Sequence, residues 1–168
     1  MAQLLEQQGV IITGGTRGIG KAIAEAALAE GARVLITGRS QASVDEALSL
    51  VNHPALSGMP ADVASEDDTV AVFARALELF GQVHAVVNNA GIARAGAVHN
   101  LRLKDFQRVM DTNLNGAFLY SREAFRVMKD TGGGRILNIG SAITLGSSGS
   151  EMVRLTTVPN AINASGAT

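Results

Sequence analysis

Residues 10–20 read VIITGGTRGIG, and the order of residue types in this stretch predicts a specific succession of local structures. The apolar VIIT predicts a short buried strand, Gly14 and Gly15 predict a tight turn, and a helix is expected to begin near Gly18. Glycine lets the backbone approach a ligand closely, and the free N–H groups at a helix start can hold a pyrophosphate. The spacing Gly14-x-x-x-Gly18-x-Gly20 is looser than the common G-x-G-x-x-G motif. A glycine-rich turn without a ligand is therefore the alternative interpretation of this motif alone.

The composition limits the class of protein. The 168 residues are 46% apolar and 17% charged, which is typical of one globular domain. The net charge of −1, from 14 basic and 15 acidic side chains, gives no reason to expect nucleic acid or a membrane as a partner. Without cysteine there is no disulfide, thiolate nucleophile or zinc–thiolate site, and we expect no metal. We see no signal peptide or membrane-length apolar run and expect a cytoplasmic protein.

Strand and helix patterns alternate along the whole chain. The apolar runs predict strands at residues 10–13, 33–37, 83–87 and 135–139, and a weaker one that ends near residues 59–62. Helices are expected at residues 18–30, 43–50, 65–80, 103–110 and 113–129. Apolar strands separated by helices form a parallel sheet that is covered on both faces. We therefore predict a doubly wound α/β fold, as a single domain over residues 1–168.

Apolar residues at helical spacing predict the face of each helix that packs. The predicted faces are Ile19, Ala22, Ile23, Ala26 and Ala27 in the first helix, and Val70, Phe73, Ala74 and Leu77 in the helix at 65–80. In the long helix they are Leu114, Ala117, Phe118, Ser121, Phe125 and Met128. Ser43 and Ser65 are expected to cap the helices that they begin.

Glycine and polar residues follow each predicted strand. They are the glycine turn, Gly38-Arg39-Ser40, Asp62, the NNAG motif at residues 88–91, and Ser141. Doubly wound sheets bind ligands at the carboxyl ends of their strands. This convergence supports a ligand site more strongly than the first turn does alone.

With these motifs in the same order, the sequence resembles the short-chain dehydrogenase/reductase family. The matching residues are TGGTRGIG at 13–20, Asp62-Val63, NNAG at 88–91, Asn113 in DTNLNG and Ser141 in NIGS. The resemblance covers about residues 8–145. It implies a Rossmann-like sheet, a nicotinamide dinucleotide, and hydride transfer to or from the carbonyl or secondary alcohol of a small molecule.

The resemblance also implies a role for individual residues. The implied cofactor-binding residues are Gly14, Thr16, Arg17, Gly18, Ile19, Gly20, Arg39, Ser40, Asp62, Val63, Asn88, Ala90 and Gly91. The glycines would shape the pyrophosphate turn, and Ile19 would offer a backbone N–H to phosphate. Asp62 and Val63 would contact the adenine, and Asn88 with the backbone that follows it would line the adenosine side. A plain strand-ending turn is the alternative interpretation of the NNAG motif.

The end of the second strand indicates which cofactor is used. A dehydrogenase of this kind that uses NAD typically has an acid there, which accepts from the ribose 2′-OH. Here the position holds Gly38, followed by Arg39 and Ser40, and Arg17 lies within the glycine turn. A guanidinium fork and a serine hydroxyl suit a 2′-phosphate, so we predict NADP(H) rather than NAD(H). Alternatively, both arginines are ordinary solvated residues.

The catalytic half of the family pattern is incomplete. Ser141 would hold the substrate oxygen, and Asn113 would support a lysine through water. By analogy, the proton-transferring tyrosine should lie about thirteen residues beyond the serine, with a lysine four residues later that lowers its pKa. That position holds Arg154, and the sequence contains no Tyr-x-x-x-Lys. Tyr120, the only tyrosine, has Ala124 at the lysine spacing and is interpreted as a core or interface residue.

The segment at residues 142–168 departs from the family pattern and contains poor helix formers, so we expect an irregular tail. Truncation, a frameshift, missing internal segments, a natural short form and completion by a partner chain are the explanations left open.

Two functions follow: an oxidoreductase of doubtful activity in this form, or a non-catalytic NADP(H)-binding module or inactive fragment. Family members pair through the long helix, so we expect a dimer or tetramer through residues 113–129, whose apolar face would otherwise be open.

Overall fold

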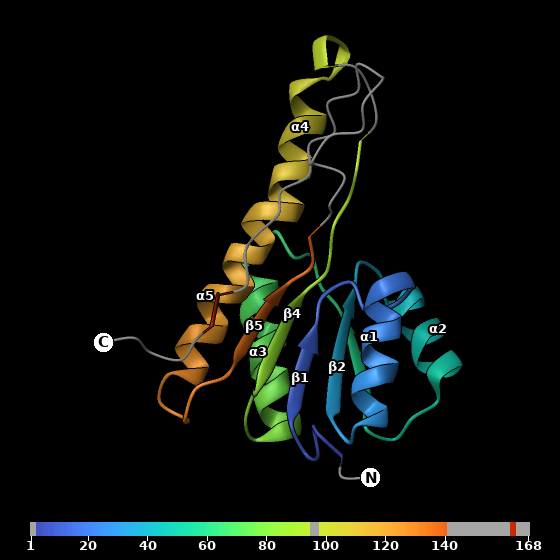
Figure 1. Ribbon diagram of the computed structural model, residues 1–168. Helices are drawn as coiled ribbons and strands as arrows, with labels where there is room; N and C mark the ends of the chain where they lie inside the picture. Colours follow the sequence, from blue (N-terminus) through green and yellow to red (C-terminus); the bar gives the residue numbers. More distant parts are fainter. Residues whose placement is uncertain (1–2, 95–97, 141–161, 164–168) are drawn as a thin grey trace, which may run out of the picture.

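The computed structural model describes residues 3–94, 98–140 and 162–163, and its elements alternate as the sequence predicts (Figure 1). The strands are β1 (Gly9–Ile12), β2 (Arg33–Gly38), β3 (Leu56–Pro60), β4 (Ala85–Asn88), β5 (Arg135–Asn138) and β6 (Ile162–Asn163). The α-helices are α1 (Gly18–Ala29), α2 (Gln41–Val51), α3 (Glu66–Phe80), α4 (Leu103–Met110) and α5 (Gly116–Met128). A 3₁₀ turn, η1 (Val98–Asn100), precedes α4, and a π-helical turn, η2 (Asp111–Asn115), joins α4 to α5.

The sheet has the predicted doubly wound topology. Its strand order is β3-β2-β1-β4-β5-β6, and β1 to β5 run parallel to one another. The chain winds outward in one direction from β1 to β3 and in the other from β4 to β5, so the strand order reverses between β1 and β4. The two residues of β6 pair antiparallel with the start of β5. The other residues of the predicted irregular tail lie outside the described ranges.

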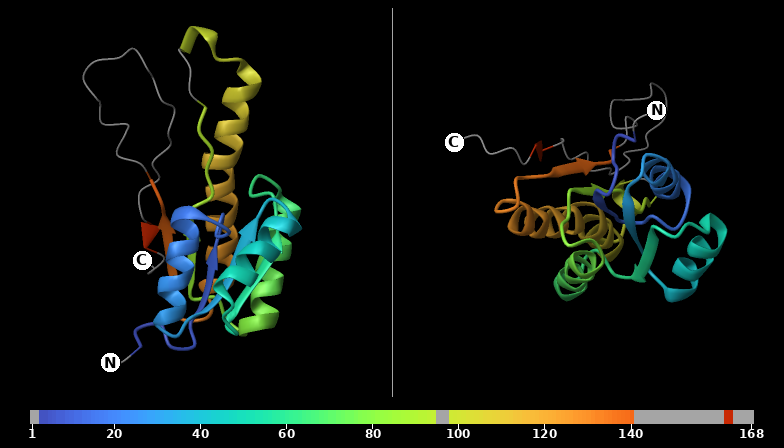
Figure 2. Two further views of the ribbon diagram at one scale, coloured as in Figure 1. Left: turned by 90° about the vertical axis from the view of Figure 1, so that its right-hand side faces the viewer. Right: turned by 90° about the horizontal axis from the view of Figure 1, so that it is seen from below.

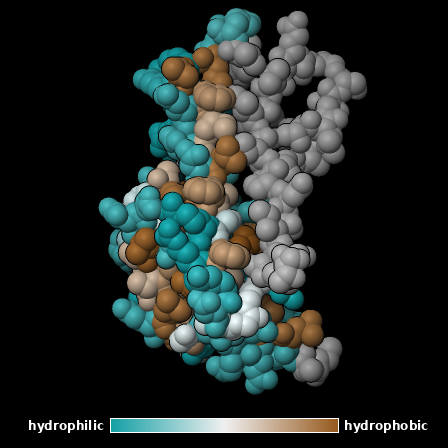
Figure 3. Space-filling model, turned by 90° about the vertical axis from the view of Figure 1, so that its left-hand side faces the viewer, coloured by the Kyte–Doolittle hydropathy of each residue, from teal (hydrophilic) through white to brown (hydrophobic). Residues whose placement is uncertain are grey.

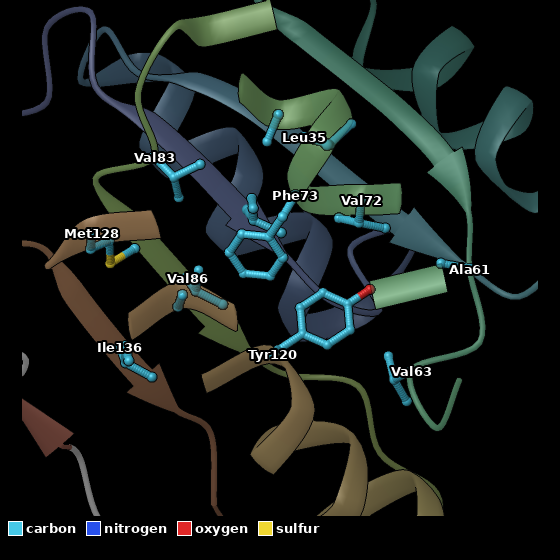
Figure 4. Packing of buried hydrophobic residues seen from close by; sticks show 13 residues of the cluster. Leu35, Ala61, Val63, Val72, Phe73, Val83, Val86, Tyr120, Met128 and Ile136 are labelled. Carbon is cyan, nitrogen blue, oxygen red and sulfur yellow. The ribbon is translucent and has the colours of Figure 1, made fainter. Parts of the chain in front are cut away.

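Helices cover both faces of the sheet, and each face has its own core (Figure 2). Side chains alternate along a strand, so Ile11 faces the layer of α3 and α5 while Ile12 faces the layer of α1 and α2. The core under α3 and α5 contains Phe73 and Tyr120, whose ring centroids lie 5.8 Å apart at 53° (Figure 4). Tyr120 is fully buried, which agrees with its interpretation as a core residue.

Three details of the helices differ from the sequence predictions. The helix predicted to start at Ser43 begins at Gln41, because Ser40 is the N-cap and its hydroxyl accepts from the Ser43 N–H at 3.3 Å. In α3, the buried face consists of Thr69, Val72, Phe73 and Ala76. Val70 is 46% exposed, because α3 has two overlapping apolar rows and the row that contains Phe73 and Ala76 meets the sheet. In α1, the buried residues are Gly20, Ala24, Ala27 and Leu28, whereas the predicted Ile19 is exposed.

The long helix also packs differently from the predicted face. Its buried residues are Gly116, Leu119, Tyr120, Ala124 and Met128. Of the predicted face, Met128 is buried, but Leu114, Phe118 and Phe125 are 41%, 59% and 54% exposed. The face that contains Tyr120, Ala124 and Met128 packs on the core and leaves Leu114, Phe118 and Phe125 uncovered. This agrees with the expectation that an apolar face of this helix would be open.

The two helices predicted at 103–110 and 113–129 are continuous through η2 and form one rod that rises beyond the carboxyl ends of the strands (Figure 1). A Cβ on Gly116 would lie 2.9 Å from a methyl group of Val63, so the rod leans closely on the loop after β3. None of the described helices combines the length and the apolar character that crossing a membrane requires. The position of the rod makes α4 one wall of the space above the sheet.

Candidate functional site

A cavity of about 630 Å³, the carboxyl-end cleft, lies above the ends of β1 to β4 and beside α4. It gathers residues from the glycine turn, from the ends of β2, β3 and β4, and from α4 and η2. The predicted cofactor-binding residues that line it are Gly14, Thr16, Arg17, Gly18, Ile19, Gly20, Arg39, Asp62, Val63, Ala90 and Gly91. Ser40, Asn88 and Asn113 are not among its lining residues. The cleft lies at the topological switch point, where doubly wound sheets bind their ligands.

The glycine turn has two residues in the left-handed region, Gly14 at φ +63° and Gly18 at φ +55°. A Cβ on Gly14 would lie 3.0 Å from the Ala90 Cα, so glycine allows this turn to pack against the loop after β4. A Cβ on Gly18 would meet nothing within 4 Å. The turn is thus tight on its protein side and open on the side of the cleft, where a ligand could approach the backbone.

The N-terminus of α1 opens onto the cleft without a side-chain cap. Its N-cap residue, Arg17, makes no capping hydrogen bond, whereas the hydroxyls of Ser40 and Ser65 cap α2 and α3. The first N–H groups of an α-helix have no partner within the helix, and they lie at the positive end of its dipole. The backbone of Gly18 and Ile19 therefore offers donors for an anionic group such as a phosphate.

Thr13 and Asn89 join the glycine turn to the loop after β4. The Thr13 Oγ1 accepts from the backbone N–H groups of Asn89 and Ala90, at 3.0 and 2.9 Å. The Asn89 side-chain amide donates to the carbonyls of Thr13 and Gly14, at 3.0 and 3.2 Å. Sequence reasoning gave these two residues no role, although both lie within its motifs. They hold two loops of the cleft in a fixed relative position.

The loop after β3 is held by carboxylates. Asp68, on α3, accepts from the backbone N–H of Asp62 at 2.7 Å. Asp62 in turn accepts from the N–H of Ala64 through its own carboxylate at 3.0 Å. Val63 is buried, because its side chain packs against Gly116 of the long helix. The loop predicted to contact an adenine therefore has a defined shape at the edge of the cleft.

Two arginines face the cleft from the turns after β1 and β2. Arg17 and Arg39 are exposed, and neither guanidinium has an ion-pair or hydrogen-bond partner within the described ranges. Gly38, the last residue of β2, is buried, and a Cβ there would lie 2.5 Å from the Thr16 methyl group. The Ser40 hydroxyl accepts the capping hydrogen bond from the Ser43 N–H. This end of the cleft therefore has two available cations and no acid at the Gly38 position.

Asn88 has a different position from the one predicted. It is buried, and its side-chain amide donates to the Ser121 hydroxyl at 3.1 Å and to the Asn138 Oδ1 at 2.8 Å. Alternation along β4 turns this side chain toward α5 and β5, away from the cleft. Asn88 thus joins β4 to α5 and β5 in this structure.

Asn113 lies in the π-helical turn and clamps the loop after β4. Its Oδ1 accepts from the Ile92 N–H, and its amide donates to the Ile92 carbonyl, both at 2.9 Å. π-helical turns are frequent at functional sites, because they place a side chain out of the regular helical row. Ser141, the other predicted catalytic residue, lies outside the described residues, as does Arg154.

Tyr120 cannot serve the cleft as a proton donor. Burial raises the pKa of its phenol well above the ordinary value, and the nearby Thr37 hydroxyl acts in the opposite direction as a smaller effect. The Tyr120 hydroxyl and the Thr37 Oγ1 are both buried, and neither has a well-aligned hydrogen-bond partner among the described residues. The phenol keeps its proton in this position, and Tyr120 does not line the cleft.

The helix α4 supplies a further wall of the cleft that sequence reasoning missed. The lining residues that it and the following π-helical turn contribute are Lys104, Gln107, Arg108, Asp111 and Thr112. Their spacing of three or four residues was visible in the sequence, but the position of the helix was not. In the described part of the chain, no group of His, Asp and Glu is arranged to hold a metal ion.

Comparisons with known proteins agree with this geometry. The family profile described as short chain dehydrogenase matches residues 8–153. The chain is 35% identical to the 3α-hydroxysteroid dehydrogenase of Mediterraneibacter gnavus, over 86% of the chain and 60% of that protein. It is 36% identical to the 3-oxoacyl-[acyl-carrier-protein] reductase of Vibrio cholerae, over 86% of the chain and 59% of that protein. The NADP-dependent (R)-specific alcohol dehydrogenase of Lentilactobacillus kefiri is 38% identical, over 84% and 57%. The chain thus spans less than two thirds of the length of these relatives.

Proposed function

This chain belongs to the short-chain dehydrogenase/reductase family, and from that premise we propose that its carboxyl-end cleft binds NADP(H). The proposed activity is that of an oxidoreductase, with hydride transfer between the cofactor and the carbonyl or secondary alcohol of a small molecule. The named relatives act on a hydroxysteroid, a carrier-bound oxoacyl group and an alcohol, and these names support that substrate class without selecting a member of it.

The observation that carries the proposal is the pair of available arginines beside a position without an acid. Arg17 and Arg39 line the cleft, and Gly38 stands where a carboxylate would accept from a ribose 2′-OH. A 2′-phosphate has up to two negative charges and three acceptor oxygens, which suit guanidinium forks. A relative that is described as NADP-dependent adds support to this choice of cofactor.

The residues of the cleft fit the rest of a dinucleotide. The uncapped N-terminus of α1 and the open side of Gly18 suit the pyrophosphate, because N–H donors and unfilled space coincide there. The loop at Asp62 and Val63 would receive the adenine at the opposite side of the cleft. When bound, the nicotinamide would supply or accept the hydride.

Proton transfer is the step for which the sequence lacks the family residues. Ser141 and Asn113 are proposed to belong to the catalytic site, with Ser141 orienting the substrate oxygen. Asn113 would shape the site through its two bonds to Ile92. With Tyr120 buried and no Tyr-x-x-x-Lys in the sequence, we expect the 168-residue chain by itself to show little or no turnover.

Calorimetric titration of the purified chain with NADPH and with NADH tests the cofactor proposal. We expect NADPH to bind more tightly, and Arg39→Ala to weaken NADPH by about tenfold while NADH changes little. Lys21→Ala, which removes a cation that is paired with Glu25 on α1, is the matched control. Tighter binding of NADH, or an unchanged NADPH affinity in Arg39→Ala, would contradict the proposal.

A second function is supported by the uncovered side of the long helix. Leu114, Phe118 and Phe125 are exposed there, and a surface of this kind favours association. The alternative is a non-catalytic NADP(H)-binding module that forms a homo-oligomer through this helix. Tight NADPH binding without ketone reduction would favour the module, whereas reduction by a chain of confirmed mass would favour the enzyme.

A further inference from the structure

The helix α4 presents a row of polar side chains to the carboxyl-end cleft. Lys104, Arg108 and Thr112 succeed one another at intervals of four residues, and all three line the cavity. Residues four apart lie on the same face of an α-helix, so the row runs along the wall of the cleft. The other side of α4 is apolar, with Val109 buried and Phe106 partly buried. The fold therefore orients the polar side toward the space above the sheet.

Several other cations of the protein are held by ion pairs. Arg102, also on the α4 segment, is held by Asp105 at 2.7 Å, and Arg75 pairs with Glu78 at 3.0 Å. In the described part of the chain, the side chains of Lys104 and Arg108 have neither an ion pair nor a hydrogen bond. They line the cleft together with Arg17 and Arg39, which lack such partners as well.

The two acids of the cleft offset only part of this positive charge, and both are themselves hydrogen-bonded. Asp111 accepts from the Asn115 side-chain amide at 2.9 Å, and Asp62 accepts from the backbone N–H of Ala64 at 3.0 Å. Four cations and two carboxylates thus line one cavity, with both carboxylates already engaged. An excess of available donors around a cleft favours an anionic ligand with several acceptor oxygens.

The position of the row indicates which part of the ligand it would meet. The long helix contacts the loop after β3 where Gly116 packs on Val63. Arg108 precedes Gly116 by eight residues, so its backbone lies at most about 12 Å farther along the rod, and it lines the same cleft as the proposed adenine loop. The N–H groups that suit the pyrophosphate belong to α1, on another wall of the cleft. The row therefore faces the adenosine end rather than the pyrophosphate.

We propose that Lys104 and Arg108 determine cofactor specificity by holding the 2′-phosphate from the α4 side of the cleft, opposite Arg39. The inference rests on the proposed binding of NADP(H) and adds a second cationic wall to it. A phosphate with three acceptor oxygens can accept donors from both walls at once. The flexible side chains of lysine and arginine can bend over the adenosine when it binds.

Titration of the full chain and of Lys104→Gln, Arg108→Gln and the double variant tests this inference. The ligands are NADPH, NADH, adenosine 2′,5′-bisphosphate and adenosine 5′-monophosphate, at low and at high ionic strength. We expect each single variant to weaken NADPH and the bisphosphate by about three- to tenfold, and to change NADH and the monophosphate by less than about twofold. The loss should be smaller at high ionic strength.

Arg102→Gln is the matched control, because it removes a cation of the same helix segment that is paired with Asp105 and does not line the cleft. It should leave the ratio of NADPH to NADH affinity unchanged. An equal loss for both dinucleotides in Arg108→Gln, or a ratio no different from the control, would overturn the inference. A wild-type chain that binds neither dinucleotide would instead overturn the proposed function itself.

Discussion

At the residue scale, Gly18 combines an unusual backbone with an unusual amount of free space. Its φ of +55° disfavours a side chain, yet a Cβ there would meet no other atom of the described residues within 4 Å. Gly81, which ends α3, has the same two properties at φ +76°, but it lies at the opposite end of the sheet from the cleft. Comparing the same substitution at these two glycines therefore distinguishes its cost in stability, which arises from the backbone, from its effect on the binding of a ligand.

We predict that Gly18→Ala and Gly81→Ala each lower the free energy of unfolding by about 1 kcal/mol, because both force alanine into the left-handed region. Only Gly18→Ala should weaken NADPH, since its methyl group would fill space in the cleft. Chemical denaturation and calorimetry measure the two effects. Equal NADPH affinity in both variants would contradict the assignment of the glycine turn to the pyrophosphate.

The buried phenol of Tyr120 leads to a prediction about alkaline pH. Burial raises its folded-state pKa above the unfolded value of about 10, so the folded protein retains the proton more strongly than the unfolded chain. The stability from this group is full below pH 10 and decreases as the pH rises above 10 toward the folded pKa. Since the sequence has one tyrosine and no tryptophan, absorbance at the tyrosinate band reports on Tyr120 alone.

We expect no tyrosinate signal from the folded protein at a pH where the denatured chain is already ionised. Tyr120→Phe retains the ring against Phe73 and removes a hydroxyl that has no well-aligned hydrogen-bond partner among the described residues, so the unfolding free energy near pH 7 should change by less than about 1 kcal/mol. Its stability should then be less sensitive to alkaline pH than that of the wild type. A folded-state phenol that titrates normally would show that Tyr120 is accessible to water.

At the scale of single elements, α2 and α3 each begin with a serine that caps the helix, and a hydroxyl engaged in capping is less available to a ligand. Ser40 was predicted to bind the cofactor, but its hydroxyl caps α2. Ser65 caps α3, whose first turn is acidic and therefore complements the helix dipole. Both serines satisfy backbone N–H groups that would otherwise lack a partner.

We predict that Ser40→Asp preserves the stability of the protein to within about 0.5 kcal/mol, because aspartate is an equally good N-cap. The added charge lies beside Arg39 and should weaken NADPH by about tenfold, with a smaller effect on NADH. Ser65→Asp is the control that should alter neither affinity. Denaturation and titration of the two variants measure these effects, and an equal loss for both dinucleotides would argue against a 2′-phosphate near Ser40.

At the scale of the whole molecule, the side that carries the long helix exposes large apolar side chains. Figure 3 shows apolar side chains that interrupt the polar surface on the side of the long helix. On α5, Phe118 lies against the Arg122 guanidinium, which also pairs with Glu66 of α3. On β5, Leu137 is 43% exposed, although its neighbour Ile136 is buried under α5. The exposed side chains of the long helix are the basis of the proposed homo-oligomer, whereas Leu137 lies on the opposite face of the sheet from α5.

We predict that the double substitution Phe118→Ser and Phe125→Ser reduces self-association and lowers the unfolding free energy of the monomer by less than about 1 kcal/mol, since both residues are more than half exposed. Leu50→Ser on α2, where the side chain is 67% exposed, is the matched control. Sedimentation or light scattering measures the state of assembly. An unchanged mass in the double variant would remove the long helix from the interface.

The sequence alone determined the order of elements, the parallel sheet and the glycine turn, because those depend on local periodicity and on the backbone freedom of glycine. It also placed most of the cleft residues, since the carboxyl ends of parallel strands necessarily converge. Only the tertiary structure decided which row of each helix is buried, as in α5, where the row with Ala124 and not the row with Phe125 meets the sheet. It likewise turned Asn88 away from the cleft and brought Arg108 to it, because those positions depend on contacts between elements distant in the sequence.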